Sequence, residues 1–231
     1  MHHRFGKTIV LGLGGSVIVP NDVDTKLLAA WKELIDRHSK KHRFVIVVGG
    51  GKLARRYQEA AAAVHSISAR EKDLIGIEAT RLNAKLVQSV FGSRADAELI
   101  DSETKAKPLT KPVTVGCGWE KQTGRSTDYA AAVLADIYGA AAVIMAGKPA
   151  FVYDRNPDQF VTAKPFTELS WKQYAKIAPK KWTPGANVPI DPVCAKFCRT
   201  HGIAAIVADG RNLRNMERLL AGEECDGTLV S

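Results

Sequence analysis

The sequence has no long hydrophobic run and few aromatic residues. None of its apolar stretches approaches the roughly 20 residues that cross a bilayer, and the N-terminus lacks the apolar segment of a signal peptide. We therefore expect a cytoplasmic protein without a membrane partner. Only 7% of the residues are aromatic, and they do not alternate with basic residues as on a surface that stacks bases. This pattern argues against a nucleic-acid partner.

Cysteine is also scarce, and the four cysteines form no C-x-x-C pair. Four cysteines in 231 residues do not make a disulfide framework, so we expect buried, reduced thiols. Cys194 and Cys198 are four residues apart on an expected helix, which leaves a shared metal as the alternative. We assign no protein metal site.

The most informative stretch is 44–58, which reads FVIVVGGGKLARRYQ. Five β-favouring residues run into three glycines, and helix-forming residues follow from Leu53. A glycine turn at a helix start exposes backbone N–H groups at the positive end of the helix dipole, which suits an anion. Lys52, Arg55 and Arg56 add positive charge, as does the net charge of +9. The stretch indicates a phosphate site, with an ordinary strand-to-helix turn as the alternative.

Two common phosphate motifs are absent from this stretch. A Walker-type loop would need a glycine at Ile46 and a hydroxyl residue at Leu53, and the third glycine of the Rossmann pattern would fall on Ala54. A phosphate bound here would therefore belong to another architecture.

Strand and helix signals alternate along the whole chain. A first strand at 8–13 ends in Gly14-Gly15-Ser16, and later strands are expected at 112–116, 141–145 and 203–208. This alternation predicts a three-layer α/β/α sandwich around a mostly parallel sheet. The two glycine turns should then meet at one edge of the sheet, where ligands of such folds bind.

Several local predictions can be compared with a structure. Thr127 or Asp128 should cap the helix 129–138, and Asp191-Pro192 should start another helix. Residues 227–231 should form an edge strand. The helix 70–91 should bury a stripe made of Leu74, Ile77, Leu82 and Leu86, with Asp73, Thr80, Arg81 and Asn83 close to it.

Taken together, these stretches resemble the amino acid kinase superfamily, and most closely its uridine monophosphate (UMP) kinases of the archaeal type. The resemblance rests on the order of short motifs along nearly the whole chain, which are Gly14-Gly15-Ser16, VGGGKLAR at 48–55, IGIEATRLNA at 75–84, Ser126-Thr127-Asp128, Val152-Tyr153 with Pro157, IDPVCAK at 190–196 and Gly227-Thr228. It implies one domain, with an acceptor lobe at 1–117 and an ATP lobe at 118–231. It also implies a homo-oligomer built from dimers, up to a hexamer.

The resemblance further implies phosphoryl transfer from ATP, accompanied by Mg²⁺, to UMP. Gly50, Gly51 and Arg55 would hold the acceptor phosphate, with Asp73 on the ribose and Thr80 in the same site. Thr127, Asp128 and Lys52 would form the catalytic group. Gly14, Gly15 and Ser16 would bind the ATP phosphates, and Tyr153 and Pro157 would belong to the ATP site.

The chain departs from the family pattern near the nucleotide. Gly12 stands where many members carry a lysine, and 146–153 and 118–125 replace two family motifs. Lys121, Arg125 or Lys148 could supply the missing positive charge. The departures leave two further readings open: a kinase for another small phosphate or carboxylate, and a non-catalytic protein that stores nucleotide or an oxoanion such as molybdate.

Overall fold

The computed structural model describes residues 1–120, 123–181 and 188–231. The strands are β1 (Thr8–Leu13), β2 (Arg43–Val48), β3 (Val113–Gly116), β4 (Ala142–Gly147), β5 (Val152–Tyr153), β6 (Pro165–Phe166), β7 (Glu168–Leu169), β8 (Ala204–Asp209) and β9 (Thr228–Val230). The α-helices are α1 (Gly15–Ile18), α2 (Thr25–His38), α3 (Gly51–Val64), α4 (Ala69–Phe91), α5 (Thr127–Ile137), α6 (Trp171–Ile177), α7 (Pro192–His201) and α8 (Leu213–Ala221).

Seven strands form one sheet in the order β3-β2-β1-β4-β8-β9-β7. The pairs from β3 to β8 are parallel, and β9 runs antiparallel to β8. The predicted edge strand at 227–231 is wrong in its position, because β7 lies outside β9 and pairs with it. β5 pairs with β6 in a small, separate antiparallel ribbon.

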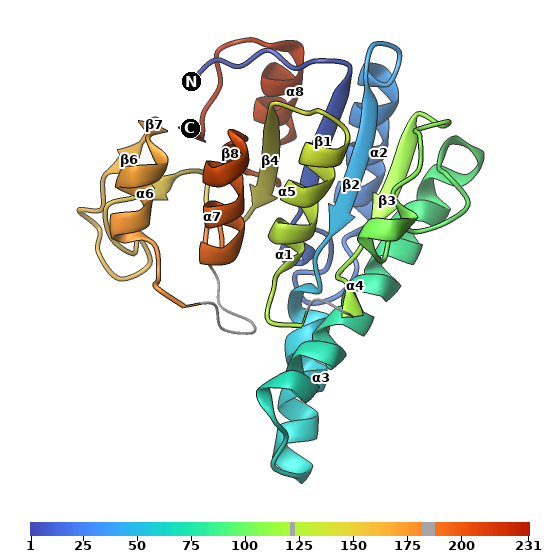
Figure 1. Ribbon diagram of the computed structural model, residues 1–231, viewed down its shortest axis with the longest axis vertical. Coiled ribbons are helices and arrows are strands. Elements are labelled where there is room, and N and C mark those ends of the chain that lie inside the picture. Colours follow the sequence, from blue (N-terminus) through green and yellow to red (C-terminus); the bar gives the residue numbers. More distant parts are fainter. Residues whose placement is uncertain (121–122, 182–187) are drawn as a thin grey trace.

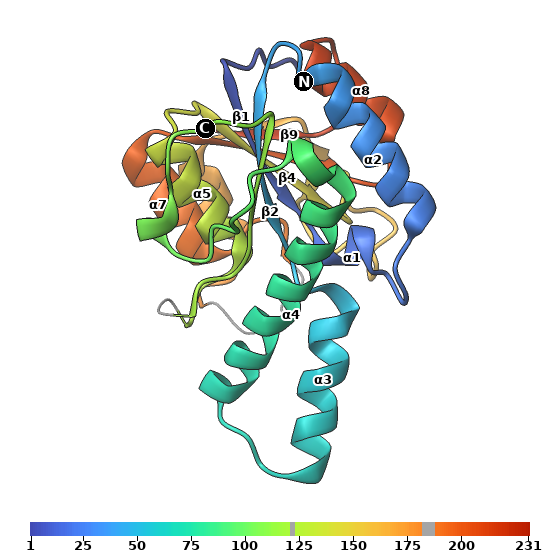
Figure 2. The same cartoon turned by 90° about the vertical axis from the view of Figure 1, so that its right-hand side faces the viewer.

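Helices cover both faces of the sheet and make the predicted three layers (Figure 2). The side chains of each strand alternate between the two faces, as the two-residue period of a β-strand requires. In β2, Phe44, Ile46 and Val48 face α2, α4 and α8, while Val45 and Val47 pack with α5. The two faces thus carry separate apolar cores. Among the described residues, no helix is long and apolar enough to cross a bilayer.

Most helix ends follow the expected capping chemistry, with one correction. Asp24 and Asn212 cap α2 and α8, and Asp191 caps α7 ahead of Pro192. Thr127 and Asp128 do not cap α5, because Ser126 accepts the N–H groups of Asp128 and Tyr129. A side-chain oxygen caps from the residue before the first helical turn, and α5 begins at Thr127.

The long helix α4 buries a different stripe from the predicted one. Leu82 is 62% exposed, whereas Asp73, Thr80 and Asn83 are buried. These three polar side chains therefore lie on the buried side of the helix. Their hydrogen-bond partners lie in the glycine turns and in the loop before α5.

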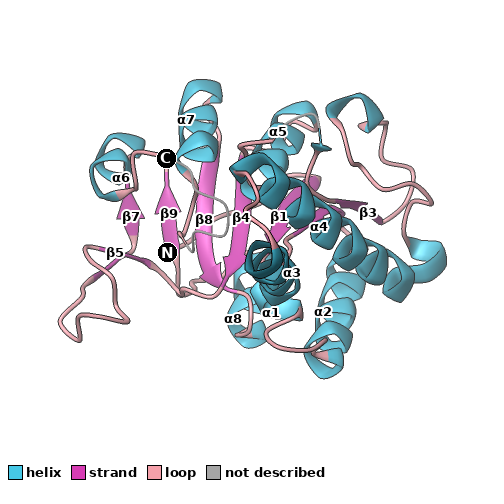
Figure 3. Ribbon diagram, turned by 90° about the horizontal axis from the view of Figure 1, so that it is seen from below, coloured by secondary structure: helices cyan, strands magenta, loops and turns pink. Residues whose placement is uncertain are grey.

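The hairpin of α3 and α4 extends beyond the body of the sheet, below the carboxyl ends of β1 and β2 (Figures 1 and 2). Seen from that end, α3 and α4 lie on one side of α5 and α7 (Figure 3). Because α3 follows β2 and α5 follows β3, both helices start at the carboxyl end of these parallel strands.

Candidate functional site

The two glycine turns meet at the carboxyl edge of the sheet, as predicted. Gly49 donates its N–H to Leu13 O at 3.0 Å, so the two turns stay in register. A Cβ on Gly15 would lie 2.1 Å from Gly51 N, and Gly51 itself has φ +62°. Only glycine allows this backbone approach and this left-handed conformation. Asn83 of α4 fixes the second turn by donating to the carbonyl oxygens of Gly49 and Gly50.

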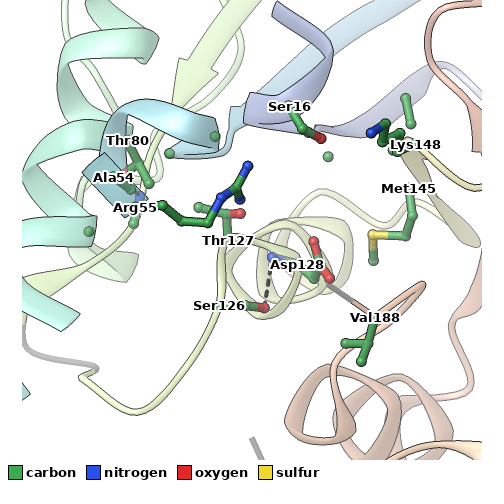
Figure 4. Close-up of a pocket in the computed structure, with 18 of the residues that line it drawn as sticks. Ser16, Ala54, Arg55, Thr80, Ser126, Thr127, Asp128, Met145, Lys148 and Val188 are labelled. Atoms are coloured by element: carbon green, nitrogen blue, oxygen red, sulfur yellow. Dashed lines mark hydrogen bonds between the residues drawn. The ribbon is translucent and has the colours of Figure 1, made fainter. Parts of the chain in front are cut away.

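An open cavity lies in front of these turns (Figure 4). Its walls come from both glycine turns, α3, α4, the start of α5, and the segment that follows β4. Of the residues predicted as functional, it collects Gly14, Ser16, Gly50, Gly51, Arg55, Asp73, Thr80, Thr127 and Asp128. Side chains and glycines that lie as far apart in the sequence as Gly14 and Asp128 thus line the same cavity.

The start of α3 is suited to an anion. Its first turn carries no acidic residue, and Gly50 at the N-cap offers no side chain to bond the exposed N–H groups. Arg55 extends from the second turn into the cavity toward Thr127 (Figure 4). The helix dipole, the backbone N–H groups at Gly50 and Gly51 and a guanidinium together favour a phosphate at this end.

The starts of α5 and α7 are joined by a hydrogen-bonded pair of caps. The Ser126 hydroxyl donates to the Asp191 carboxylate, and that carboxylate also accepts from Val193 N at 2.7 Å and Cys194 N at 3.0 Å. Ser126 in turn caps α5, so one chain of bonds fixes both helix starts. This holds Thr127 and Asp128 at the cavity wall.

Asp128 has the most perturbed carboxyl group of the cavity. Burial, and then the charge of nearby Asp191, raise the pKa of Asp128 to about 7. A cation or a hydrogen-bond donor in the cavity would favour its ionised form. Asp128 is therefore responsive to what the cavity holds.

Asp73 and Thr80 bind the loop that precedes α5. The buried carboxylate of Asp73 accepts from Gly124 N at 2.5 Å, and burial raises the pKa of Asp73 while this bond partly opposes the rise. The Thr80 hydroxyl donates to Ile77 O and accepts from Gly118 N at 2.8 Å. Both side chains line the cavity and also bind the backbone at Gly118 and Gly124.

Other predicted residues lie elsewhere. Lys52 does not line the cavity, and its ammonium group donates to Asn21 at 2.6 Å. Gly15 lies behind the wall, against the second glycine turn. Tyr153 and Pro157 line a second cavity, which adjoins the first and shares Lys148, Pro149, Val188 and Pro189 with it.

The candidate replacement cations can also be placed. Lys148 and Arg125 both line the main cavity. The guanidinium of Arg125 stacks over Tyr129, with its central carbon (Cζ) 4.5 Å from the ring centre. Lys121 lies outside the described residues. The four cysteines are buried and reduced, as expected, and the Cys194 and Cys198 sulfurs are 3.9 Å apart.

Sequence reasoning missed several lining residues. Gln58 and Gly76 lie where α3 and α4 pack, and Met145 faces Gly12 across the β1–β4 pair. The i, i+3 spacing of Arg55 and Gln58 was an available signal, because it puts both on one helix face. No sequence signal pointed to Met145, because its place at the cavity depends on the pairing of β1 with β4.

An α/β sandwich with a cation-lined cavity at a glycine-rich sheet edge is the architecture of a phosphate-binding protein. The sequence model described as "Amino acid kinase family" matches residues 7–209, and the chain belongs to that family.

Curated relatives and solved structures agree with this membership. The chain is 31% identical over 224 residues to a uridylate kinase of Methanosarcina barkeri, covering 96% of this chain and 95% of that one. It is 34% identical to a uridylate kinase of Methanocorpusculum labreanum, covering 96% and 94%. The crystal structure of uridylate kinase from Archaeoglobus fulgidus superposes with a TM-score of 0.81 at 31% identity, covering 98% of this chain and 100% of that one.

Proposed function

We propose that the protein is a uridylate kinase, which transfers a phosphoryl group from ATP to UMP. The observation that carries the proposal is the single cavity in which Arg55 and the uncapped start of α3 face Thr127 and Asp128. The similarity to proteins named uridylate kinase extends over nearly the whole chain and supports the same conclusion.

In this proposal the acceptor phosphate binds at the start of α3. The N–H groups at Gly50 and Gly51, together with Arg55, hold the phosphate and leave one oxygen facing Thr127. That oxygen forms a bond to the γ-phosphorus of ATP as the bond to the β,γ-bridging oxygen breaks, which yields UDP and ADP. The acceptor is already anionic, so positioning and charge neutralisation replace a strong base.

The donor would occupy the other side of the site. Gly14 and Ser16 lie at the main cavity and would face its phosphates, while Tyr153 and Pro157 line the adjoining cavity that would hold the rest of the nucleotide. Gly15 contributes by letting the two turns approach. Asp73 would meet the acceptor ribose, and Thr80 would hold the neighbouring loop.

The residues present also fit a nucleotide-bound Mg²⁺. This ion keeps several waters and usually takes one or two carboxylates besides substrate phosphates, so Asp128 suffices as a protein ligand. Bound with ATP, Mg²⁺ would neutralise phosphate charge. Its presence would lower the pKa of Asp128, because a cation favours the ionised form.

The test is formation of ADP from ATP and Mg²⁺ with UMP, cytidine monophosphate and small phosphate or carboxylate acceptors. We expect turnover selective for UMP, and a loss of at least about 100-fold in kcat/KM for UMP in Arg55→Ala. Arg56→Ala is the matched control, because this neighbouring arginine is exposed and points to Asp22 at 3.9 Å. Selective turnover of another acceptor, or a folded protein with no turnover and bound oxoanion, would contradict the proposal.

We also propose that copies of the chain associate through the outer side of α3 and α4. Val23 and Leu82 are exposed there and line an apolar groove together with Leu53 and Leu86. Light scattering should report an oligomer that Leu82→Glu dissociates. A monomeric wild-type protein would refute this.

The expected cytoplasmic location stays a prediction.

A further inference from the structure

We propose that Lys148 is a further catalytic residue, whose ammonium group binds the terminal phosphates of the donor and neutralises the charge of the transferring phosphoryl group. The proposal rests on the proposed kinase function. It concerns the residue that follows β4 directly.

The backbone before Lys148 is held from two sides. Gly14 N donates to Ala146 O at 2.9 Å, and Gly210 N donates to Gly147 O at 2.9 Å. Arg211 donates to the carbonyl of Lys148 itself at 3.3 Å. These bonds tie the end of β4 to the first glycine turn, so the side chain of Lys148 starts from a fixed point next to it.

The side chain lies at the junction of the two cavities. Lys148 lines the main cavity with Arg55 and Thr127, and it also lines the cavity that contains Tyr153 and Pro157. In Figure 4 its ammonium group is turned toward Ser16, on the side of the cavity away from Arg55. A nucleotide that spans the two cavities must place its phosphates at this junction.

The ammonium group of Lys148 is also available. It makes no hydrogen bond or ion pair with another residue in the described ranges 1–120, 123–181 and 188–231. Arg125, by contrast, donates to the Tyr129 hydroxyl at 3.0 Å and stacks on its ring. Lys148 can therefore move onto a phosphate without breaking a hydrogen bond or ion pair to any described residue, whereas Arg125 must leave its tyrosine.

The floor of the cavity cannot supply this charge. Gly12 pairs with Met145 across β1 and β4, and a Cβ at position 12 would lie 3.3 Å from the Met145 sulfur. The floor is thus apolar and filled. A positive charge for the donor side has to come from the rim, where Lys148 is, and Arg55 supplies the acceptor side.

The experiment compares Lys148→Met with Lys148→Arg and with Lys172→Met, which removes the charge of an exposed side chain on α6 that lines neither cavity. With UMP and ATP, we expect Lys148→Met to lower kcat by about 100-fold, as for the loss of one transition-state contact. The dissociation constant for UMP should stay within about twofold. Lys148→Arg should recover most of the rate, because it keeps the charge, and Lys172→Met should match the wild type.

Binding measurements separate this proposal from the proposed function. By calorimetry with Mg²⁺, Lys148→Met should bind ATP about tenfold more weakly and adenosine equally well, since one charged phosphate contact is lost. An unchanged kcat and ATP affinity, or an equal loss of adenosine, would overturn the role of Lys148. If the wild type fails to phosphorylate UMP, the ATP–adenosine comparison still decides whether Lys148 binds phosphate. A wild-type protein that binds no ATP would overturn both proposals.

Discussion

Single residues set how closely the backbones of the site approach each other, and Gly15 shows this most directly. Alanine at this position would place its Cβ 2.1 Å from Gly51 N and 2.4 Å from Gly49 O. Both are backbone atoms, which cannot rotate away as the end of a side chain can, so one of the two glycine turns must move. We expect Gly15→Ala to lower the free energy of unfolding by about 2–3 kcal/mol and to weaken nucleotide binding.

Urea denaturation measures the first effect. Gly6→Ala serves as the control, because a Cβ there meets nothing within 4 Å. Equal stability of the two variants would show that the turns are less rigidly packed than the structure indicates.

A second residue-scale prediction concerns pH and Asp128. Its pKa is about 7 in the folded protein against 3.8 for the free side chain, so the folded state holds the proton between these values. The free energy of unfolding should therefore decrease as pH rises from about 4 to about 7. In Asp128→Asn this decrease should be smaller by roughly 1–3 kcal/mol.

Urea unfolding at pH 5, 6, 7 and 8 would measure the difference. Asp22→Asn is the control, since its side chain is 94% exposed. Parallel pH profiles for wild type and Asp128→Asn would mean that the burial of Asp128 and the charge of Asp191 have little effect.

At the scale of elements, Ser126 connects two helices. It caps α5 and donates to Asp191, the cap of α7. We expect Ser126→Ala to cost about 1–2 kcal/mol in stability and to lower kcat at least tenfold, because Thr127 loses its fixed position.

Ser170→Ala is the matched variant. Ser170 caps α6 through a capping box and lines neither cavity. It should lose similar stability and keep full activity. If both variants retained activity, the cap of α5 would have no part in positioning Thr127.

At the scale of the whole molecule, strands from both sides of the expected lobe boundary at residue 117 share one sheet. β1 pairs with β2, which precedes that boundary, and with β4, which follows it, and α5 covers Val45 and Val47. We expect the fragments 1–117 and 118–231 to lack cooperative unfolding when separate, because each exposes a core that the other covers. Mixed in equal amounts, they should regain it.

Circular dichroism during heating would test this. A fragment 1–117 that unfolds cooperatively by itself would mean that the lobes are independent domains. The result would also decide whether the expected lobe boundary at 117 has physical meaning.

The local sequence determined the elements whose causes are local. Apolar runs predicted the strands β1, β2 and β8, and capping chemistry predicted the start of α7 at Asp191-Pro192. The glycine turn at 49–51 indicated an anion site because glycine and helix starts carry that chemistry in themselves. The family resemblance added the acceptor and donor roles, which remain proposals.

The tertiary structure alone decided which face of a helix is buried and which side chains meet. Leu82 fits an apolar stripe in sequence but lies outside, because β2 and β3 face the side of α4 that carries Ala84 and Val87. Ser126 meets Asp191, and Gly12 meets Met145, only through the packing of α5 on α7 and of β1 on β4. Such contacts join residues that are distant in the chain, so they follow from the assembled sheet and not from any local pattern.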